Sequence, residues 1–248
     1  MAPPSVLVLP WKPLLPHMIN LSKRAEKKEL LDSDNIPFAD IKQNMKELNT
    51  VNTLLGGHAI TIEGIRKISS GISGHVTICE IGCGGGDNLS AIAKWCRKKN
   101  IDADLIGIDI KRECIEYAQM QYPDLNTEWL VNDYARVVFR TRPSIVFSSL
   151  FCHHFRDDEM VAMLQWMQDN SSKGFFINDL HRHPAAYYSI KWITGLFSRS
   201  YLVKNDAPLS VARSFKRKEW EALLQKAGIR NYSIQWKWAF RYLVICKK

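Results

Sequence analysis

The stretch VTICEIGCGGGD, residues 76–87, places an apolar, β-branched run before an acid and a set of closely spaced glycines. This pattern predicts a buried strand that turns directly into a helix. Glycine at Gly82, Gly84 and Gly86 permits positive φ and lets a nucleotide-type cofactor lie against unshielded backbone. A dinucleotide fingerprint counted from Gly82 needs glycine at position 87, where this chain has Asp87. The spacing therefore disfavours a nicotinamide dehydrogenase and indicates another cofactor of nucleotide type.

Strand and helix patterns alternate from this stretch onward. We predict strands at residues 76–81, 105–110, 127–131, 144–149 and 174–178, and helices at residues 88–99, 112–121 and 157–168. A helix at 218–227 and β-rich runs at 229–238 and 240–246 follow, and the two runs predict an edge hairpin. The alternation predicts an α/β fold with right-handed crossovers and a mostly parallel sheet. Ligands bind such sheets at the carboxyl ends of the strands.

The chain before residue 74 has a different pattern. Residues 1–18 are proline-rich and lack a basic start, so they make a poor signal peptide and are expected to be a disordered leader. A charged helix is predicted at 21–31, and a second has apolar residues at helical spacing: Ile41, Met45, Leu48, Val51 and Leu55. With a further short helix within 58–73, we predict a helical cap at 19–73. The main domain is then 74–248, with a lid insertion at about 181–213.

Composition limits the class of protein. The chain has 248 residues, of which 46% are apolar, and no apolar run approaches the ~20 residues of a membrane span. Its six cysteines form no CxxC pair, so we expect reduced thiols and a cytoplasmic protein. Residues 180–248 hold 14 basic and three acidic side chains. This excess suits an anionic substrate, a membrane surface or nucleic acid, and it equally suits a solvated basic face.

Two further acids follow predicted strands: LIGIDI ends near Asp109, and WLVNDYA contains Asp133. Together with EIGCGGG and FKRKEWEALLQKAGI, these phrases resemble the class I S-adenosylmethionine-dependent methyltransferases over residues 74–248. The resemblance implies a Rossmann-like, seven-stranded sheet of order 3-2-1-4-5-7-6 with strand 7 antiparallel. It also implies S-adenosylmethionine as cofactor and S-adenosylhomocysteine as its product.

The resemblance assigns cofactor roles by position. The backbone of Gly82, Cys83 and Gly84 would approach the methionyl part, and Glu80 would orient the turn. Asp109, followed by Ile110, would accept hydrogen bonds from both ribose hydroxyls. Asp133 would meet the adenine amino group beside Tyr134, and Leu150 would lie near the methionyl end. For Asp109 alone, a helix N-cap is the alternative interpretation.

The acceptor side is indicated by SSLFCHHF, NDLHRHPAAYY and NDAPLSVARSF. They resemble quinone-type methyltransferases and those that accompany type III polyketide synthases, which implies a small phenolic or quinoid acceptor of secondary metabolism. His154 is the candidate general base, unless it only orients its loop. The candidate substrate contacts are His153, His181, Arg182, His183, Tyr187 and Tyr188. Arg182 or Arg213 would hold an acceptor oxygen, unless this basic, aromatic loop is cap core.

Other functions remain open at this point. Cys152 and the HH and HxH pairs at 153–154 and 181–183 could gather metal ligands, but no carboxylate triad accompanies them, so we expect no metal. An RNA methyltransferase would use the basic C-terminal quarter, yet no NPPY-type motif is present, and nucleic acid is the less favoured partner. A non-catalytic cofactor-binding partner protein is the third possibility.

Overall fold

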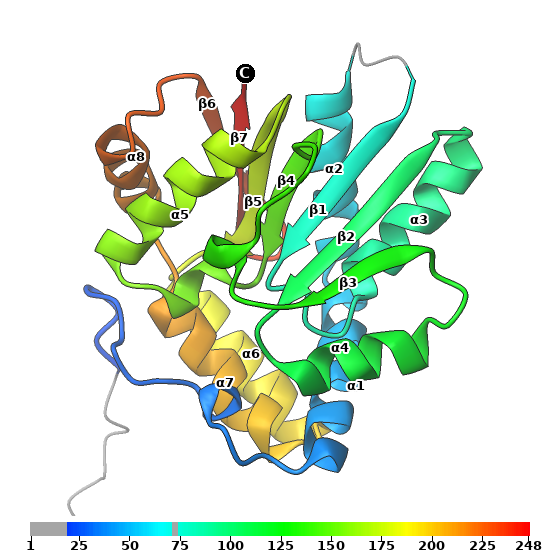
Figure 1. The fold of residues 1–248 in the computed structure, drawn as a ribbon. Coiled ribbons are helices and arrows are strands. Elements are labelled where there is room, and N and C mark those ends of the chain that lie inside the picture. Colours follow the sequence, from blue (N-terminus) through cyan, green and yellow to red (C-terminus); the bar gives the residue numbers. More distant parts are fainter. Residues whose placement is uncertain (1–18, 71–73) are drawn as a thin grey trace, which may run out of the picture.

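A computed structural model describes residues 19–70 and 74–248 of the chain. Its centre is a seven-stranded sheet of order β3-β2-β1-β4-β5-β7-β6 (Figure 1). Strands β1 to β5 run parallel, and β7 pairs antiparallel with both β5 and β6. The strands are β1 (Val76–Ile81), β2 (Ala103–Asp109), β3 (Thr127–Val131), β4 (Ile145–Ser149), β5 (Gly174–Leu180), β6 (Tyr232–Lys237) and β7 (Arg241–Lys247). The predicted fold class and strand order are confirmed.

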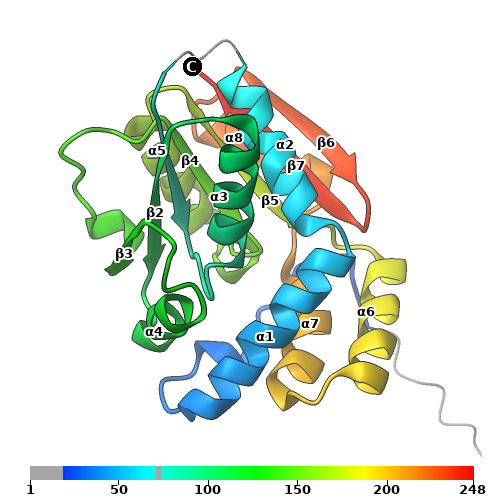
Figure 2. The same cartoon turned by 90° about the vertical axis from the view of Figure 1, so that its right-hand side faces the viewer.

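Helices cover both faces of the sheet (Figures 1 and 2). On one face α5 (Asp157–Asn170) and α8 (Arg217–Lys226) bury Met163, Leu164 and Trp220 against the strands. On the other, α2 (Gly57–Ser69) and α3 (Asp87–Lys99) pack in a second apolar cluster, while α4 (Arg112–Gln121) lies near β2 and β3. Strand β4 is buried along its whole length. Its sequence IVFSS accordingly contains no charged residue and does not alternate between apolar and charged positions.

A cap lies beyond the carboxyl ends of β1 to β5. It consists of α1 (Phe38–Leu54), α6 (Pro184–Phe197) and α7 (Tyr201–Arg213), which are grouped below the sheet in Figure 2. The predicted lid insertion is therefore a pair of packed helices, and Pro208 lies within α7. The short helix predicted after residue 57 is α2, which packs on the sheet and does not join the cap. The proposed domain boundaries stay predictions.

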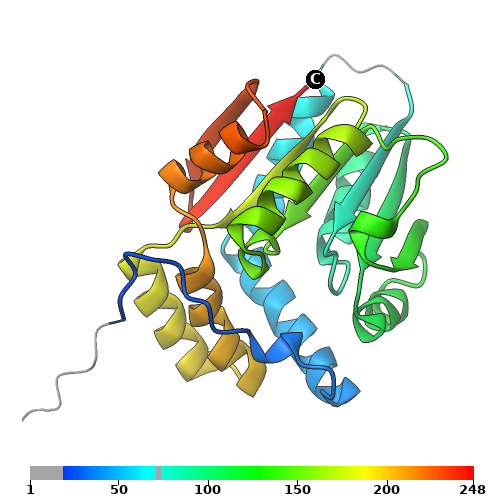
Figure 3. The same cartoon turned by 60° about the vertical axis from the view of Figure 1, so that its left-hand side comes forward.

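The predicted helix at 21–31 is wrong. This segment instead crosses the cap in an extended course, with one short 3-10 turn η1 (Leu30–Asp32), as the blue segment beside α7 shows in Figure 3. Its backbone bonds to α7: Ala25 N–H donates to the Ala212 carbonyl, and the Leu30 and Leu31 N–H groups donate to Asp206. These tertiary hydrogen bonds replace those of a helix, so local propensity did not decide the structure.

The cysteines and the lengths of the helices bear on the expectations of reduced thiols and of no membrane span. All six cysteines lie in the described part of the chain, and they are buried and unpaired there. Within residues 19–70 and 74–248, the helices all fall short of the length and hydropathy needed to cross a membrane. The predicted leader at residues 1–18 lies outside the described residues.

Candidate active site

The glycine turn, residues 82–86, joins β1 to α3. Gly82, Gly84 and Gly86 have φ of 65°, 50° and 75°, which L side chains adopt at a cost. A Cβ on Gly82 would lie 2.4 Å from the ring of Phe151, whereas one on Gly84 would meet only Met45 Sδ at 3.6 Å. The turn is thus held tightly on one side, and its backbone lies open to the space beyond the sheet.

A large cleft of about 800 Å³ opens beside the glycine turn. It follows the carboxyl ends of β1, β2 and β4, where the loops after parallel strands meet. All nine residues predicted to bind the cofactor line it: Glu80, Gly82, Cys83, Gly84, Asp109, Ile110, Asp133, Tyr134 and Leu150. The structure therefore brings together residues that are spread over 70 positions of the sequence.

Two acids stand at the floor of the large cleft, Glu80 fully buried and Asp109 partly buried. Asp109 accepts the Gly84 N–H at 2.8 Å and the Lys111 N–H at 2.9 Å, which ties the glycine turn to the end of β2. Burial raises its pKa, and the two N–H donors offset part of that effect. Glu80 accepts from Asn88 through Oε1 at 2.9 Å, while within the described residues its Oε2 has no hydrogen-bond partner. Burial, together with the Asp87 carboxylate, raises the pKa of Glu80 well above its ordinary value.

Asp133 and Tyr134 form the far wall of the large cleft. Asp133 accepts the Ala135 N–H at 3.0 Å and so caps the 3-10 turn η2 (Tyr134–Arg136). Its other carboxylate oxygen is available to a ligand amine. Tyr134 lies edge-on to Phe151, Phe155 and Trp166, which fixes the wall.

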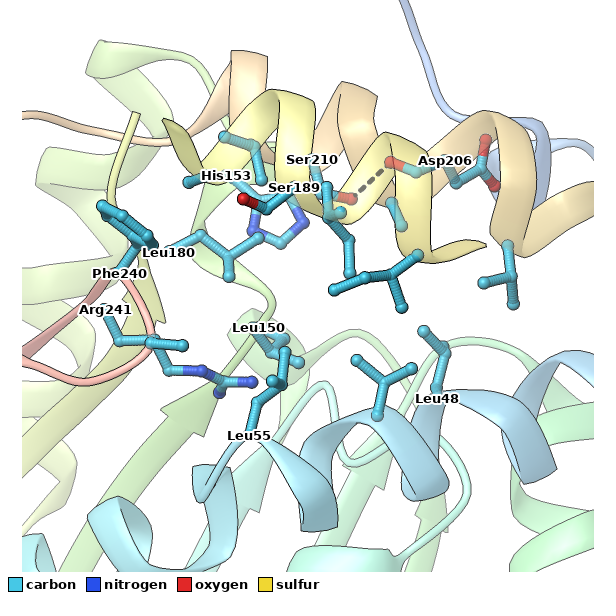
Figure 4. A pocket seen from close by; sticks show the side chains of 18 of the residues that line it. Leu48, Leu55, Leu150, His153, Leu180, Ser189, Asp206, Ser210, Phe240 and Arg241 are labelled. Carbon is cyan, nitrogen blue, oxygen red and sulfur yellow. Dashed lines mark hydrogen bonds between the residues drawn. The ribbon is translucent and has the colours of Figure 1, made fainter. Parts of the chain in front are cut away.

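A small cavity of about 340 Å³ lies between the cap and the sheet (Figure 4). Its walls come from α1, α6 and α7 and from the start of β7, and they are mostly apolar: among others Leu48, Val51, Leu55, Leu180, Ile190, Ile193, Val203 and Val211. Four residues line both this cavity and the large cleft: Leu31, Leu48, Leu150 and His154. His154 is the ionisable residue among the four, so it stands at the junction of the two spaces.

Arg241 is a buried cation in the wall of the small cavity. It extends from β7 toward Leu55 and Leu150 in Figure 4. Its Nη2 donates to Asn52 Oδ1 at 3.1 Å and its Nη1 to Asn178 Oδ1 at 3.5 Å, whereas Nε lacks a partner within the described residues. Burial lowers the pKa of Arg241 to about 10, so it remains charged at neutral pH. Its guanidinium therefore places a fixed positive charge in the wall of the small cavity.

A polar corner, formed by Glu29, His153 and His154, interrupts the apolar wall. His153 Nδ1 lies 2.8 Å from Asp179 Oδ1, and His154 Nδ1 lies 3.0 Å from Asp32 Oδ1. Their Nε2 atoms lie 3.5 Å and 3.6 Å from the two oxygens of Glu29. Burial raises the pKa of Glu29 to about 7, although His154 and a hydroxyl hydrogen bond oppose that effect.

Comparison with known proteins identifies the part of the chain that carries this site. The model of a family described as "Methyltransferase domain" matches residues 78–174, which contain the glycine turn, Asp109, Asp133 and His154. Residues 78–174 are a methyltransferase domain. For this part of the chain the predicted family and enzyme class are confirmed, and with them the S-adenosylmethionine cofactor. No curated protein sequence matches the chain.

Solved methyltransferases share the fold at low identity. The plantazolicin methyltransferase BpumL, solved with a triazolic desmethylPZN analog and SAH, is 16% identical with a TM-score of 0.63, covering 84% of this chain and 97% of its own. Human N-acetylserotonin methyltransferase with SAM is 12% identical at TM-score 0.60, covering 86% and 56%. A putative O-methyltransferase from Nostoc punctiforme is 12% identical at TM-score 0.56, covering 82% and 60%. At these identities the likeness shows the fold.

The substrate contacts predicted for this methyltransferase lie in different parts of the structure. His153 and His154 line the small cavity, but among the described residues that line it His181, Arg182, His183, Tyr187 and Tyr188 do not occur. Arg182 is buried, and its guanidinium donates to the Leu21 and Ser214 carbonyls and to Glu219. The rings of His181 and His183 pack on Tyr242 and Phe240, 4.7 Å and 5.2 Å away. Arg182, His181 and His183 thus make their contacts with other protein groups, and the substrate roles predicted for the five residues outside this lining stay predictions.

Some of the cavity residues that were not predicted as substrate contacts follow a recognisable sequence pattern, and others do not. The apolar stripe of α1 supplies Leu48, Val51 and Leu55, so its spacing was a usable signal. Arg213, proposed to hold an acceptor oxygen, lines the large cleft instead and donates to the backbone carbonyls of Lys27, His153 and His154. Glu29 and Arg241 belong to no apolar spacing of this kind.

Proposed function

We propose that this methyltransferase transfers the methyl group of S-adenosylmethionine to a small aromatic acceptor enclosed in the small cavity. The acceptor class is phenolic, quinoid or polyketide-derived. The observation that carries the proposal is the junction at Leu150 and His154, where an apolar cavity under the cap meets the large cleft. Methyl transfer is an in-line displacement at carbon, and it is favoured where two reactants are held in contact away from water.

The volume and lining of the small cavity support a compact acceptor. At about 340 Å³ it lies near the lower end of small-molecule sites, which span roughly 300–1,000 Å³. Flat rings suit its aliphatic walls, because apolar contact is their main source of binding energy. We assign Arg241 the task of binding an acceptor oxygen through its guanidinium.

We propose His154 as the catalytic residue. It lies at the junction, and Asp32 at 3.0 Å from its Nδ1 fixes the ring so that Nε2 faces the cavity corner. A phenolic hydroxyl bound between His154 and Arg241 would lose its proton to the imidazole as its oxygen attacks the sulfonium methyl group. The products are the methyl ether and S-adenosylhomocysteine.

The test combines binding and turnover. Calorimetry measures S-adenosylmethionine binding, and the protein is then incubated with methyl-labelled cofactor and a panel of phenols, quinones and alkylresorcinols, with RNA as the control. Label on a member of the panel supports the proposal. Label on RNA alone refutes it, and cofactor binding without any methylated product supports the non-catalytic alternative.

A cavity-filling variant tests whether the acceptor lies in the small cavity. Ile190 on α6 lines that cavity, and Leu196 on the same helix is 71% exposed, so Ile190→Trp and Leu196→Trp form a matched pair. We expect Ile190→Trp to abolish turnover of the acceptor with unchanged cofactor affinity, and Leu196→Trp to leave both unchanged. Equal turnover by the two variants would place the acceptor elsewhere.

A further inference from the structure

The polar corner has the components of a metal site. The ligand atoms of Glu29, His153 and His154 lie within 4.8 Å of one another, and the first two residues are buried. Two imidazoles and one carboxylate are the protein ligands of a well-known kind of catalytic zinc site, which leaves a fourth position open. Imidazole and carboxylate together also suit other divalent first-row ions.

The spacing of these atoms suits a cation between them. Each Nε2 lies 3.5 Å or 3.6 Å from a Glu29 oxygen, which is longer than a good hydrogen bond. Neighbouring ligands of a tetrahedral zinc ion, bound at ~2.0–2.1 Å, are separated by about 3.3 Å. Small shifts of the side chains would therefore bring all three atoms to bonding distance.

Both histidines are oriented as metal ligands usually are. A ligating histidine typically gives its other ring N–H to a carboxylate, which fixes the tautomer and leaves the free nitrogen for the metal. Asp179 does this for His153, and Asp32 does it for His154. Asp179 also accepts the His153 N–H, so backbone and ring are fixed together.

The negatively charged side chains around the polar corner also favour a bound cation. Glu29, Asp179 and Asp206 are buried, whereas Asp32 is exposed. Glu29, Asp179 and Asp32 face the two imidazoles, and Asp206 accepts the Leu30 and Leu31 N–H groups next to Glu29. Arg213 is close, but its guanidinium donates to backbone carbonyls. Buried carboxylates are costly unless a cation compensates them.

We propose that Glu29, His153 and His154 bind one divalent cation of the zinc type, with its open coordination position facing the small cavity. The site joins Glu29, just before η1, to two histidines in the loop after β4. These residues are distant in sequence, and the expectation of no metal, which rested on the absence of a carboxylate triad, did not consider Glu29. The consequence for chemistry rests on the proposed function: a coordinated acceptor oxygen would be more acidic. His154 would then be a ligand and would take up no proton. The acceptor hydroxyl would instead lose its proton to solvent when its oxygen binds the metal.

The experiment measures metal binding directly. The full chain, freed of any polyhistidine tag, is stripped with a chelator and titrated with Zn²⁺, and the bound metal is counted by mass spectrometry. We expect one tightly held equivalent. Co²⁺ should replace Zn²⁺ and give the visible absorption of a tetrahedral site with nitrogen and oxygen ligands. A stripped protein that takes up no metal, and whose two histidines are charged at neutral pH by nuclear magnetic resonance, would overturn the proposal.

Variants locate the site. Glu29→Gln keeps the shape of the side chain, and with His154→Gln it should lower Zn²⁺ affinity at least tenfold. Asp179→Asn should lower it by about tenfold to 100-fold through His153. His75→Gln is the control, because this exposed histidine between Asp102 and Asp104 could take up metal adventitiously. Loss of binding in His75→Gln alone would refute the site. S-adenosylmethionine binding, measured on every variant, separates this failure from a failure of the proposed function.

Discussion

The contact between Gly82 and Phe151 gives a quantitative test of the glycine turn. A Cβ at position 82 would lie 2.4 Å from two ring carbons of Phe151, closer than real Cβ atoms approach other atoms. The ring is itself packed edge-on against Phe155, with centroids 4.8 Å apart, so it has little room to move. Gly82→Ala must therefore displace a packed aromatic ring.

Gly84 is the matched control for the magnitude. At both positions alanine pays about 1–2 kcal/mol for positive φ and regains about 0.4–1 kcal/mol from the unfolded chain. These contributions cancel between the two variants, since φ is 65° at Gly82 and 50° at Gly84. What remains is the overpacking at Phe151, about 1–3 kcal/mol. Gly82→Ala should thus be less stable than Gly84→Ala by that amount.

Urea denaturation without cofactor measures both free energies of unfolding. The cofactor is omitted because both residues line the large cleft, and ligand binding would add to stability. Adding Phe151→Leu to Gly82→Ala should recover most of the difference, since the smaller side chain relieves the contact. Equal stability of the two single variants would show that Phe151 does not pack on the turn as described.

Three further predictions concern the site and its surroundings. Asp109→Ala should weaken S-adenosylmethionine binding at least tenfold in calorimetry, which corresponds to about 1.4 kcal/mol. Asp104→Ala, on the exposed side of the same strand, should leave binding unchanged. Equal effects of the two variants would contradict the assignment of Asp109 to the cofactor site. Arg241→Lys keeps the charge and removes the planar guanidinium, so the acceptor KM should rise at least tenfold with unchanged cofactor affinity. An unchanged KM would exclude an acceptor role. Burial lowers the pKa of His181 to about 4, so the folded state binds its proton less readily than the unfolded chain. The contribution of this group to the free energy of unfolding is therefore complete above about pH 6.5 and falls as the pH drops toward 4. Urea denaturation should show that the stability of His181→Phe depends less on pH over that window than the stability of the unchanged protein. Parallel pH profiles of the two proteins would contradict this.

The cofactor side was predictable because its residues follow strands in sequence. Glu80, Asp109 and Leu150 each come at or just after the end of a parallel strand, so the fold class alone places them at one edge. The register confirms this: Glu80 pairs with Gly107 and Phe147 on the neighbouring strands. Most of the residues predicted for the large cleft could therefore be found from their positions at the ends of strands in the sequence.

The acceptor side depends on contacts that no local pattern records. Arg182 and Arg213 were favoured because they are near the acceptor phrases in sequence, yet Arg241 lines the cavity. The reason is strand direction: β7 is antiparallel, so its first residue, Arg241, pairs with Leu180, the last residue of β5. Knowledge of the antiparallel strand was sufficient to suggest residue 241. Glu29 is different, because its segment has no regular structure and is positioned by hydrogen bonds to α7.

The buried arginines also change what the basic C-terminal quarter implies. Arg182, Arg213 and Arg241 are among its 14 basic residues, and all three are buried. Their guanidinium groups bond to backbone carbonyls, to amide oxygens and to Glu219, which stabilises the cap and the wall of the small cavity. Nucleic-acid binding depends on cations that can reach phosphates at the surface. The charge count therefore overstates the basic surface, and part of the excess that suggested RNA serves to organise the interior around the acceptor cavity.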